Sequence, residues 1–314
     1  MKPFPETNTL TKHLSAMMTK SDNPIKIISR NSFYESSTFP VEIVTCKTAD
    51  GKNISLFCKY LGGMGPNNYG HRGGVEYEAK VYSRILNKTS ISKIKYFGQC
   101  KISDTDDALL VLEYIGETLC LHYSADLDAW EKAAEWAGKF HNYFDGKAPA
   151  FVKVYNKEYY YIWLERFKKL TYKHQENNYW LKGLLKYFED HIEILIAGNQ
   201  TIIHGEYYPK NILLKEGIIY PVDWESAAIA PGEIDLASLI EGLGKEIIEN
   251  TKTVYKKARW PLGIISDDEF EKRLLMARIY FHFWWWPENS DALNLNESEE
   301  FLQLYQLSKE VSVV

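Results

Sequence analysis

Short apolar runs separated by polar turns fill the first third of the chain and predict β-strands. In chain order, these runs are Ile25–Ile28, Val41–Cys46, Ile54–Tyr60, Ile94–Phe97 and Ala108–Tyr114. Asp50-Gly51 is a turn signal between the second run and the third. Leu10–Met18 and Gly74–Leu86 instead carry apolar residues at helical spacing. We therefore expect a mainly β segment with one leading helix and one internal helix.

After Gly116 the apolar residues recur mostly with the period of a helix. We expect one or two helices over residues 157–197, ended by Gly198, and further helices over Asp126–Phe144, Ile234–Glu249, Phe270–Trp286 and Leu293–Val314. Pro287 is expected to stop the helix before it, because proline has no amide hydrogen to donate. The rest of the chain is thus predicted to be mainly helical.

The helix expected over Asp126–Phe144 has an apolar face that includes a histidine. Asp128 and Glu131 near its start predict an N-terminal cap. His141 falls on the same face as Trp130, which favours a hydrogen-bonded core histidine over a ligand.

A β-hairpin with polar residues at its open end is predicted within the stretch from Thr201 to Leu236. Its strands are Ile212–Leu214 and Ile218–Val222, joined by the turn signal Glu216-Gly217. Asn211 enters the hairpin and Asp223 leaves it, so both lie where antiparallel neighbours are roughly 5 Å apart. An amide oxygen and a carboxylate suit Mg²⁺, which binds oxygen ligands and keeps several waters.

Glu206 precedes this hairpin on a loop that follows the apolar run Thr201–Ile203. A carboxylate on a loop beside a metal site is placed to accept a proton from a substrate hydroxyl. Glu206 is therefore our candidate catalytic base, with Asn211 and Asp223 as candidate metal ligands.

These residues resemble the catalytic core of the aminoglycoside phosphotransferase-like small-molecule kinases, whose relatives are the choline and ethanolamine kinases and, more distantly, the protein kinases. The motifs that carry the resemblance are His204-Gly205-Glu206, Asn211, Asp223-Trp224-Glu225 and Asp235-Leu236-Ala237. The family pattern is His-Gly-Asp, then Asn five residues after the Asp, then Asp-Trp-Glu or Asp-Phe-Glu. This chain departs at one position, because Glu206 stands where the family carries its catalytic Asp.

The resemblance implies an α+β, two-lobed protein-kinase-like fold. The smaller lobe, residues 1–115, would be β-rich with one key helix and would bind the nucleotide. The larger lobe, residues 116–314, would be mainly helical and would hold the catalytic loop, the metal hairpin and the acceptor pocket. By the same resemblance His204 and Asp235 would support the catalytic loop rather than take part in the chemistry.

The resemblance also implies a site for ATP in the first lobe. Lys59, on a predicted strand, would contact the phosphates, and Glu78 on the following helix would hold it in place. Glu76 is a competing partner, although Glu78 fits the family pattern better. The backbones of Glu113 and Ile115 would bond adenine at the hinge between the lobes. The polar linker from Arg30 to Thr38 is either the loop over the phosphates or an ordinary polar loop.

Composition narrows the class of protein. The chain has 314 residues, 45% of them hydrophobic and 25% charged, and a formal net charge of −5. These are globular values, and the absence of a basic excess argues against a nucleic-acid partner. The first 25 residues lack the apolar core of a signal peptide, and no run of about 18 apolar residues could span a bilayer. The four cysteines are scattered. We expect a reduced, cytoplasmic protein without a membrane partner.

The expected function is an ATP- and Mg²⁺-dependent transfer of the γ-phosphate to a hydroxyl of a small metabolite. Two alternatives remain open: a catalytically impaired nucleotide-binding protein, and another transfer on the same fold, such as AMP transfer. Most of the 22 Tyr and 9 Trp residues are expected in the core, and a minority would supply aromatic walls for an acceptor pocket in the helical lobe. The sequence leaves the acceptor and the oligomeric state open.

Overall fold

The computed structural model describes most of the chain, in two compact units. The described residues are 4–18, 25–34, 39–61, 70–102, 107–172, 178–263, 266–289 and 299–311. The first unit comprises Met1–Cys120 and Leu213–Ser226, and the second comprises Leu121–Ile212 and Ala227–Val314. The units therefore place most of the metal hairpin with the β-rich segment, and the expected division after residue 115 remains a proposal about the lobes.

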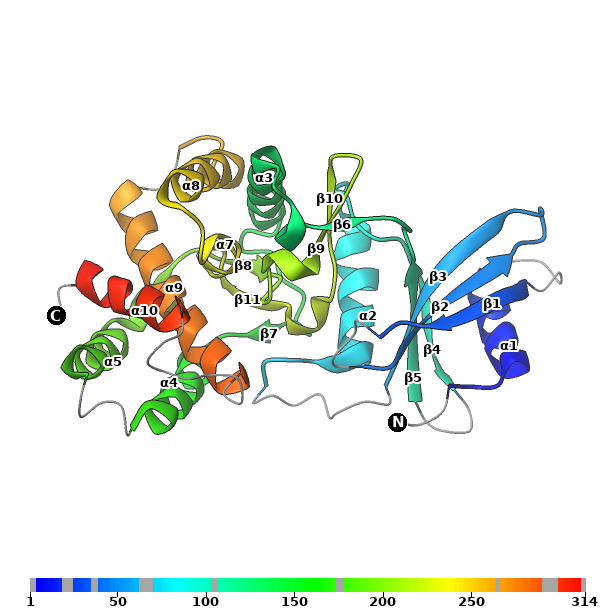
Figure 1. Cartoon of the computed structure of the whole chain (residues 1–314), viewed down its shortest axis with the longest axis horizontal. Helices are drawn as coiled ribbons and strands as arrows, with labels where there is room; N and C mark the ends of the chain where they lie inside the picture. The colour runs from blue at the N-terminus through cyan, green and yellow to red at the C-terminus, as the bar shows by residue number, and fades with distance from the viewer. Residues whose placement is uncertain are drawn as a thin grey trace. The chain divides into compact units, whose positions relative to one another are not determined.

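The first unit is built on a five-stranded antiparallel sheet in the order β1-β2-β3-β5-β4 (Figure 1). Its strands are β1 (Lys26–Ser32), β2 (Val41–Lys47), β3 (Asn53–Tyr60), β4 (Tyr96–Ile102) and β5 (Asp107–Glu113). The strand expected over Ile94–Phe97 was placed too early, because β4 begins at Tyr96 and runs on to Ile102.

The polar linker after the first strand also begins later than expected, because Arg30 lies within β1. Its guanidinium donates to both carboxylate oxygens of Glu42 on β2, at 2.8 Å each, so a charged side chain is satisfied within the sheet. The proposed phosphate-loop residues 35–38 lie outside the described residues.

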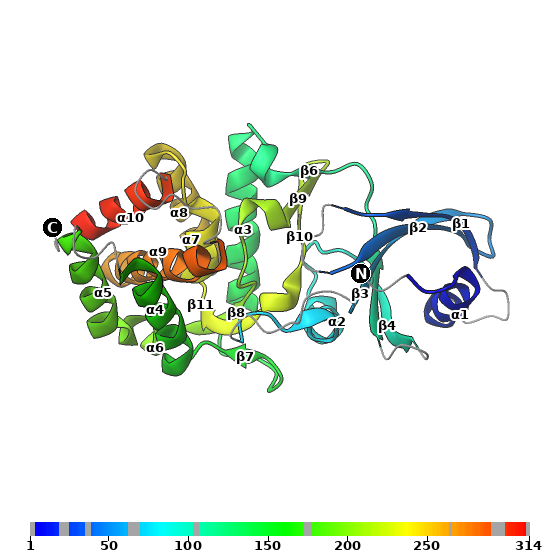
Figure 2. The ribbon, with the colours of Figure 1, turned by 60° about the horizontal axis from the view of Figure 1, so that its bottom comes forward.

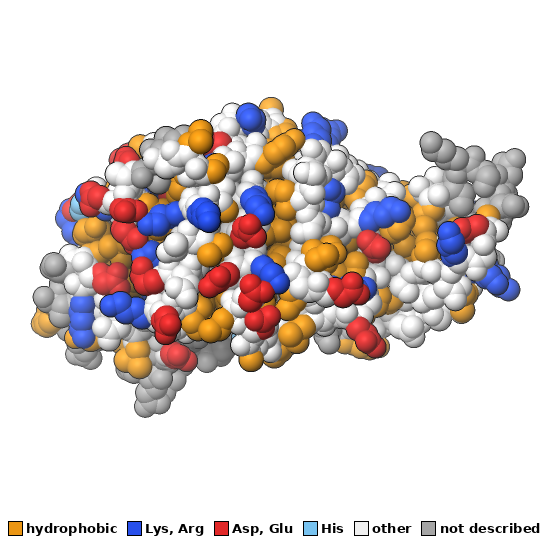
Figure 3. Space-filling view, turned by 90° about the horizontal axis from the view of Figure 1, so that it is seen from above, with side chains coloured by type: hydrophobic (Ala, Val, Ile, Leu, Met, Phe, Trp, Pro, Cys, Tyr) orange, Lys and Arg blue, Asp and Glu red, His pale blue; other side chains and the backbone are white. Residues whose placement is uncertain are grey.

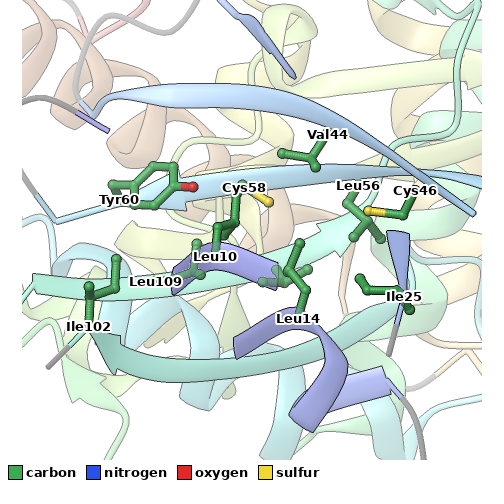
Figure 4. Close-up of a cluster of buried hydrophobic side chains, with 11 residues drawn as sticks. Leu10, Leu14, Ile25, Val44, Cys46, Leu56, Cys58, Tyr60, Ile102 and Leu109 are labelled. Atoms are coloured by element: carbon green, nitrogen blue, oxygen red, sulfur yellow. The ribbon is translucent and has the colours of Figure 1, made fainter. Parts of the chain in front are cut away.

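Helix α1 (Thr7–Met18) covers one face of this sheet. Leu10 and Leu14 are fully buried against side chains of the strands, among them Val44, Leu56 and Cys58 (Figure 4). Burying such side chains contributes roughly 1.5–3 kcal/mol each. The helix expected over Leu10–Met18 is thus confirmed, with one more turn at its start.

Helix α2 (Gly74–Arg84) lies on the opposite face of the sheet (Figure 1). Successive side chains of a strand point to opposite faces. Because Cys58 and Tyr60 belong to the core under α1, Lys59 between them points toward α2. This alternation brings the lysine to the helix that carries Glu78.

The predicted hairpin is present and forms two strands of a small second sheet. Strands β9 (Ile212–Lys215) and β10 (Ile218–Pro221) are joined by Glu216 and Gly217, which have φ values of 51° and 75°. Positive φ at both positions is the geometry of a two-residue hairpin turn of the primed kind. A third strand, β6 (Leu119–Cys120), pairs with β9 and gives the order β10-β9-β6. With two residues, β6 is too short to be recognised from sequence.

The second unit is mainly helical, as expected (Figures 1 and 2). Its helices are α3 (Leu127–Tyr143), α4 (Lys157–Thr171), α5 (Tyr179–His191), α6 (Glu193–Ala197), α7 (Glu233–Ile240), α8 (Lys245–Arg259), α9 (Asp267–Asn289) and α10 (Glu299–Glu310). A small sheet in the order β7-β11-β8 joins Lys153–Val154, Ala228–Pro231 and Gln200–Ile203. Helix α3 packs against α8, and α9 packs against α4 and α7.

Several helix boundaries differ from the predictions. The helix expected over Ile234–Glu249 is two helices, because the chain turns at Gly242, where φ is 80°. Pro287 does not stop α9 but lies in its last turn, where it removes only one hydrogen bond. The stretch 157–197 forms α4, α5 and α6 rather than one or two helices. Asp126 caps α3 by accepting from the amide of Asp128, so the cap predicted at Asp128 and Glu131 was wrong.

Charged side chains of both signs are interspersed over the face seen in Figure 3.

Within the described residues, every helix is too short or too polar to cross a membrane.

Candidate active site

A buried lysine between two carboxylates is the centre of the candidate residues in the first unit. The ammonium of Lys59 on β3 lies 2.7 Å from Oε2 of Glu78 on α2 and 2.6 Å from Oδ1 of Asp223. All three residues belong to the first unit. Lys59 therefore pairs with Glu78, whereas the competing candidate, Glu76, is exposed.

Lys59 is only 5% exposed, on a central strand of the sheet. Lys59 is therefore a core residue and not a solvated lysine at the edge of the sheet. Burial alone would lower its pKa, but the charges of Asp223, Glu78 and Glu225 outweigh that effect and raise it. Lys59 thus keeps its positive charge at neutral pH, as a phosphate-binding lysine must.

The turn that carries Asp223 is fixed to the start of α2. Asp223 has a positive φ of 66°, and the Trp224 amide after it donates to Oε1 of Glu78 at 3.3 Å. The Gly73 amide donates to the Glu225 carbonyl at 2.7 Å. These bonds tie the turn of Asp223 to the start of helix α2, whose Glu78 contacts Lys59. The three charged groups are therefore positioned together.

Glu225 was named in the motif but given no role by sequence reasoning. Its side chain is fully buried, and Nε of Arg72 lies 3.5 Å from its carboxylate. Its charge also helps to raise the pKa of Lys59. Glu225 therefore adds to the negative field around the lysine. No local pattern could have revealed a contact between residues so far apart in the chain.

The hinge segment after β5 is held by backbone and side-chain bonds. The Glu113 amide donates to Lys95 O at 2.8 Å, and the Tyr114 amide donates to Ser55 O at 3.0 Å. Lys215 of β9 donates to the Ile115 carbonyl. Among the described residues the Ile115 amide has no hydrogen-bond partner, which leaves it available to a ligand.

The candidate residues of the second unit lie on a loop that follows strand β8. The His204 and Gly205 amides donate to the two carboxylate oxygens of Asp235 at 2.6 and 2.9 Å. His141 lies 3.1 Å from the same carboxylate and 2.9 Å from the Tyr255 hydroxyl. This fully buried network holds the backbone just before Glu206 and makes His141 a hydrogen-bonded core residue.

Glu206 is buried at the tip of this loop, with Asn211 bonded to its backbone. The Tyr208 hydroxyl donates to Oε2 of Glu206 at 2.9 Å. The side-chain amide of Asn211 donates to the Glu206 carbonyl at 3.1 Å, and its backbone amide donates to Tyr208 O at 2.9 Å. The side-chain nitrogen of Asn211 donates to the Glu206 carbonyl, so its side-chain oxygen is the end that can accept a hydrogen bond or bind a cation.

A cluster of buried tyrosines lies near Glu206 in the same unit. Burial is the main reason that the pKa values of Tyr155 and Tyr280 rise, and the charge of Glu206 adds to both. Tyr155 stacks on Tyr159 at 3.8 Å between ring centroids, and the Tyr159 and Tyr280 hydroxyls lie 2.8 Å apart. The surroundings of the candidate base are therefore aromatic and rich in hydroxyl groups.

Each candidate metal ligand offers an oxygen of the kind that a hard cation binds. Among the residues the structure describes, no group of three or more His, Cys, Asp or Glu could hold a metal. Asn211 offers an amide oxygen, and the carboxylate of Asp223 is 32% exposed. Amide and carboxylate oxygens are ligands that suit Mg²⁺.

Structural comparison shows the same fold in proteins of low sequence identity. Choline kinase from Cryptosporidium parvum Iowa II superposes with a TM-score of 0.67 at 15% identity, over 98% of this chain and 96% of that chain. Choline kinase LicA from Streptococcus pneumoniae gives 0.61 at 13%, over 98% and 99%. Spectinomycin phosphotransferase APH(9)-Ia, solved with ADP and spectinomycin, gives 0.60 at 14%, over 100% of both chains.

Sequence comparison identifies the family. No functionally curated protein matches the chain. The family model described as "Phosphotransferase enzyme family" matches residues 74–259, which is more than half of the chain and includes Glu78, the loop of Glu206 and the hairpin of Asp223. The chain therefore has the α+β kinase-like fold of these structures and belongs to the phosphotransferase enzyme family.

Proposed function

We propose that the protein is an ATP- and Mg²⁺-dependent kinase that moves the γ-phosphate of ATP to a hydroxyl of a small metabolite. The observation that carries this proposal is the buried Lys59, bonded at once to Glu78 and to Asp223. A buried cation held by one carboxylate and shared with a second is the arrangement by which kinases bind the phosphates beside the metal.

The nucleotide is held by residues of the first unit. Lys59 binds the α- and β-phosphates, and Glu78 keeps its ammonium in place. The Glu113 carbonyl and the Ile115 amide bond the adenine ring, and the available Ile115 amide supports this role.

Asn211 and Asp223 would hold Mg²⁺, which would neutralise charge on the phosphates. The ADP complex of the spectinomycin phosphotransferase supports a nucleotide substrate for the fold.

Glu206 acts on the acceptor hydroxyl. Its carboxylate accepts a hydrogen bond from the hydroxyl, orients the oxygen toward the γ-phosphorus and takes the proton as the new oxygen–phosphorus bond forms. The bond between the γ-phosphorus and the bridging oxygen breaks, and ADP leaves. Asp235 supports this role by holding the amides of the two preceding residues.

A screen for the acceptor tests this proposal. ADP release from Mg·ATP is measured across sugars, amino alcohols, nucleosides and aminoglycosides, and products are identified by mass spectrometry. We expect at least one acceptor to gain a phosphoryl group. A product that carries AMP would instead show another transfer, and Mg·ATP binding without any product would show an impaired enzyme.

A further inference from the structure

We propose that Tyr208 is the positioning residue for the Glu206 carboxylate, an inference that rests on the proposed function. The Tyr208 hydroxyl donates to Oε2 of Glu206 at 2.9 Å. A hydroxyl that donates to a carboxylate makes a charge-assisted hydrogen bond, which is stronger than one between neutral groups. Tyr208 therefore fixes the position of one oxygen of the candidate base.

The backbone around Tyr208 is set so that its ring points back to Glu206. Tyr208 is extended, with φ −91° and ψ 158°, and it precedes Pro209, which disfavours any helical conformation at that position. Its carbonyl accepts from the Asn211 amide at 2.9 Å. The tyrosine is thus held by the proline after it and by the turn that leads to Asn211.

The length of Glu206 makes this contact possible. An aspartate at the same position would be shorter by one C–C bond, about 1.5 Å. A bond of 2.9 Å would then stretch well beyond hydrogen-bonding range. The additional methylene of glutamate also adds a rotatable torsion whose freedom must be restricted before the carboxylate can act. Tyr208 supplies that restriction, so we infer that Glu206 and Tyr208 act as a pair.

The other tyrosines near Glu206 are engaged with one another. The Tyr280 hydroxyl lies 2.8 Å from that of Tyr159, and Tyr155 stacks on Tyr159. The Tyr208 hydroxyl donates directly to the Glu206 carboxylate, so its loss should move the carboxylate itself.

The test is a double-mutant cycle of Tyr208→Phe and Glu206→Asp. The readouts are kcat and the KM for ATP, from ADP release with Mg·ATP and water or the best acceptor of the screen. We expect Tyr208→Phe to lower kcat by roughly tenfold and to leave the KM for ATP within about twofold. In the Glu206→Asp background the same change should alter kcat by less than about twofold, because the shorter carboxylate does not reach the hydroxyl.

Tyr207→Phe is the matched control, because it removes the neighbouring hydroxyl, which donates to Ala133 O at 2.8 Å. It should lower the melting temperature but keep kcat within about twofold. Equal losses from Tyr208→Phe in both backgrounds, or no loss in either, would overturn the positioning role alone. A wild-type protein that releases no ADP with any acceptor would remove the proposed function, and the role of Tyr208 with it.

Discussion

At the scale of single residues, the charged groups of Lys59, Glu78 and Asp223 stabilise one another. Lys59 is buried, and burying a cation without partners is strongly unfavourable. Glu78 and Asp223 compensate for that burial, and the turn at Asp223 is in turn bonded to Glu78. Removing the lysine leaves two carboxylates facing a buried site.

We expect Lys59→Met to lower both nucleotide binding and stability. The affinity for Mg·ATP, measured by calorimetry, should fall at least tenfold, because the phosphates lose their cation. The free energy of unfolding should fall by about 3 kcal/mol, because breaking a buried ion pair leaves its partners unpaired.

Lys47→Met is the control for this change, since Lys47 is an exposed lysine at the end of β2. It should leave both quantities unchanged. A Lys59→Met protein that binds Mg·ATP as tightly as the wild type would contradict the assignment.

At the scale of elements, an acidic residue whose side chain is 6% exposed joins the end of α7 to α9. Glu241 lies 3.0 Å from Nε of Arg278 and 3.0 Å from Nε2 of His282. Burial alone would raise the pKa of Glu241, but His282 and Arg278 outweigh burial and lower it to about 2. A carboxyl whose pKa is lowered by folding stabilises the protein above its ordinary pKa, and loses that contribution as the pH falls toward 2.

Glu241→Gln should therefore be more destabilising at neutral pH than in acid. We expect a loss of about 3 kcal/mol in the free energy of unfolding at pH 7, shrinking to roughly 1 kcal/mol at pH 3. Urea denaturation at the two pH values measures this. Glu135→Gln, in an exposed pair with Lys139 on α3, is the control and should show no pH-dependent change. An equal loss at both pH values for Glu241→Gln would show that its charge is not what stabilises the helices.

The sequence predicted those elements whose signals are local. Alternation revealed β3 with Lys59, and the Glu216-Gly217 turn fixed the hairpin, because two residues with positive φ permit little else. Gly242 was overlooked as a helix end because the apolar pattern continues past it. Contacts made by Tyr208 and Glu225 could not be predicted, since side-chain hydrogen bonds and burial depend on the folded loop and leave no periodic signal.

At the scale of the whole molecule, each of the two units contributes its own candidate residues. The first holds Lys59, Glu78, Asp223 and the hinge, and the second holds Glu206 and Asn211. Fold and family follow from the comparisons.

Mg·ATP should stabilise the folded protein, because a ligand that binds only the native state shifts the unfolding equilibrium. At a concentration of about 100 times Kd the gain is about 2.7 kcal/mol, which appears as a rise in melting temperature. Asp223→Asn should reduce this rise for Mg·ATP and change it less for ATP with EDTA, because the substitution removes a proposed metal ligand. Equal stabilisation of both proteins by Mg·ATP would argue against Asp223 as a ligand.

The central claim is tested most directly by the turnover and the Mg·ATP affinity of Glu206→Gln, measured with the acceptor found in the screen. Glutamine keeps the volume of glutamate but cannot take a proton. We predict that kcat falls by roughly 100-fold or more while the Kd for Mg·ATP stays within about threefold. A Glu206→Gln protein that phosphorylates the acceptor as fast as the wild type would contradict the account.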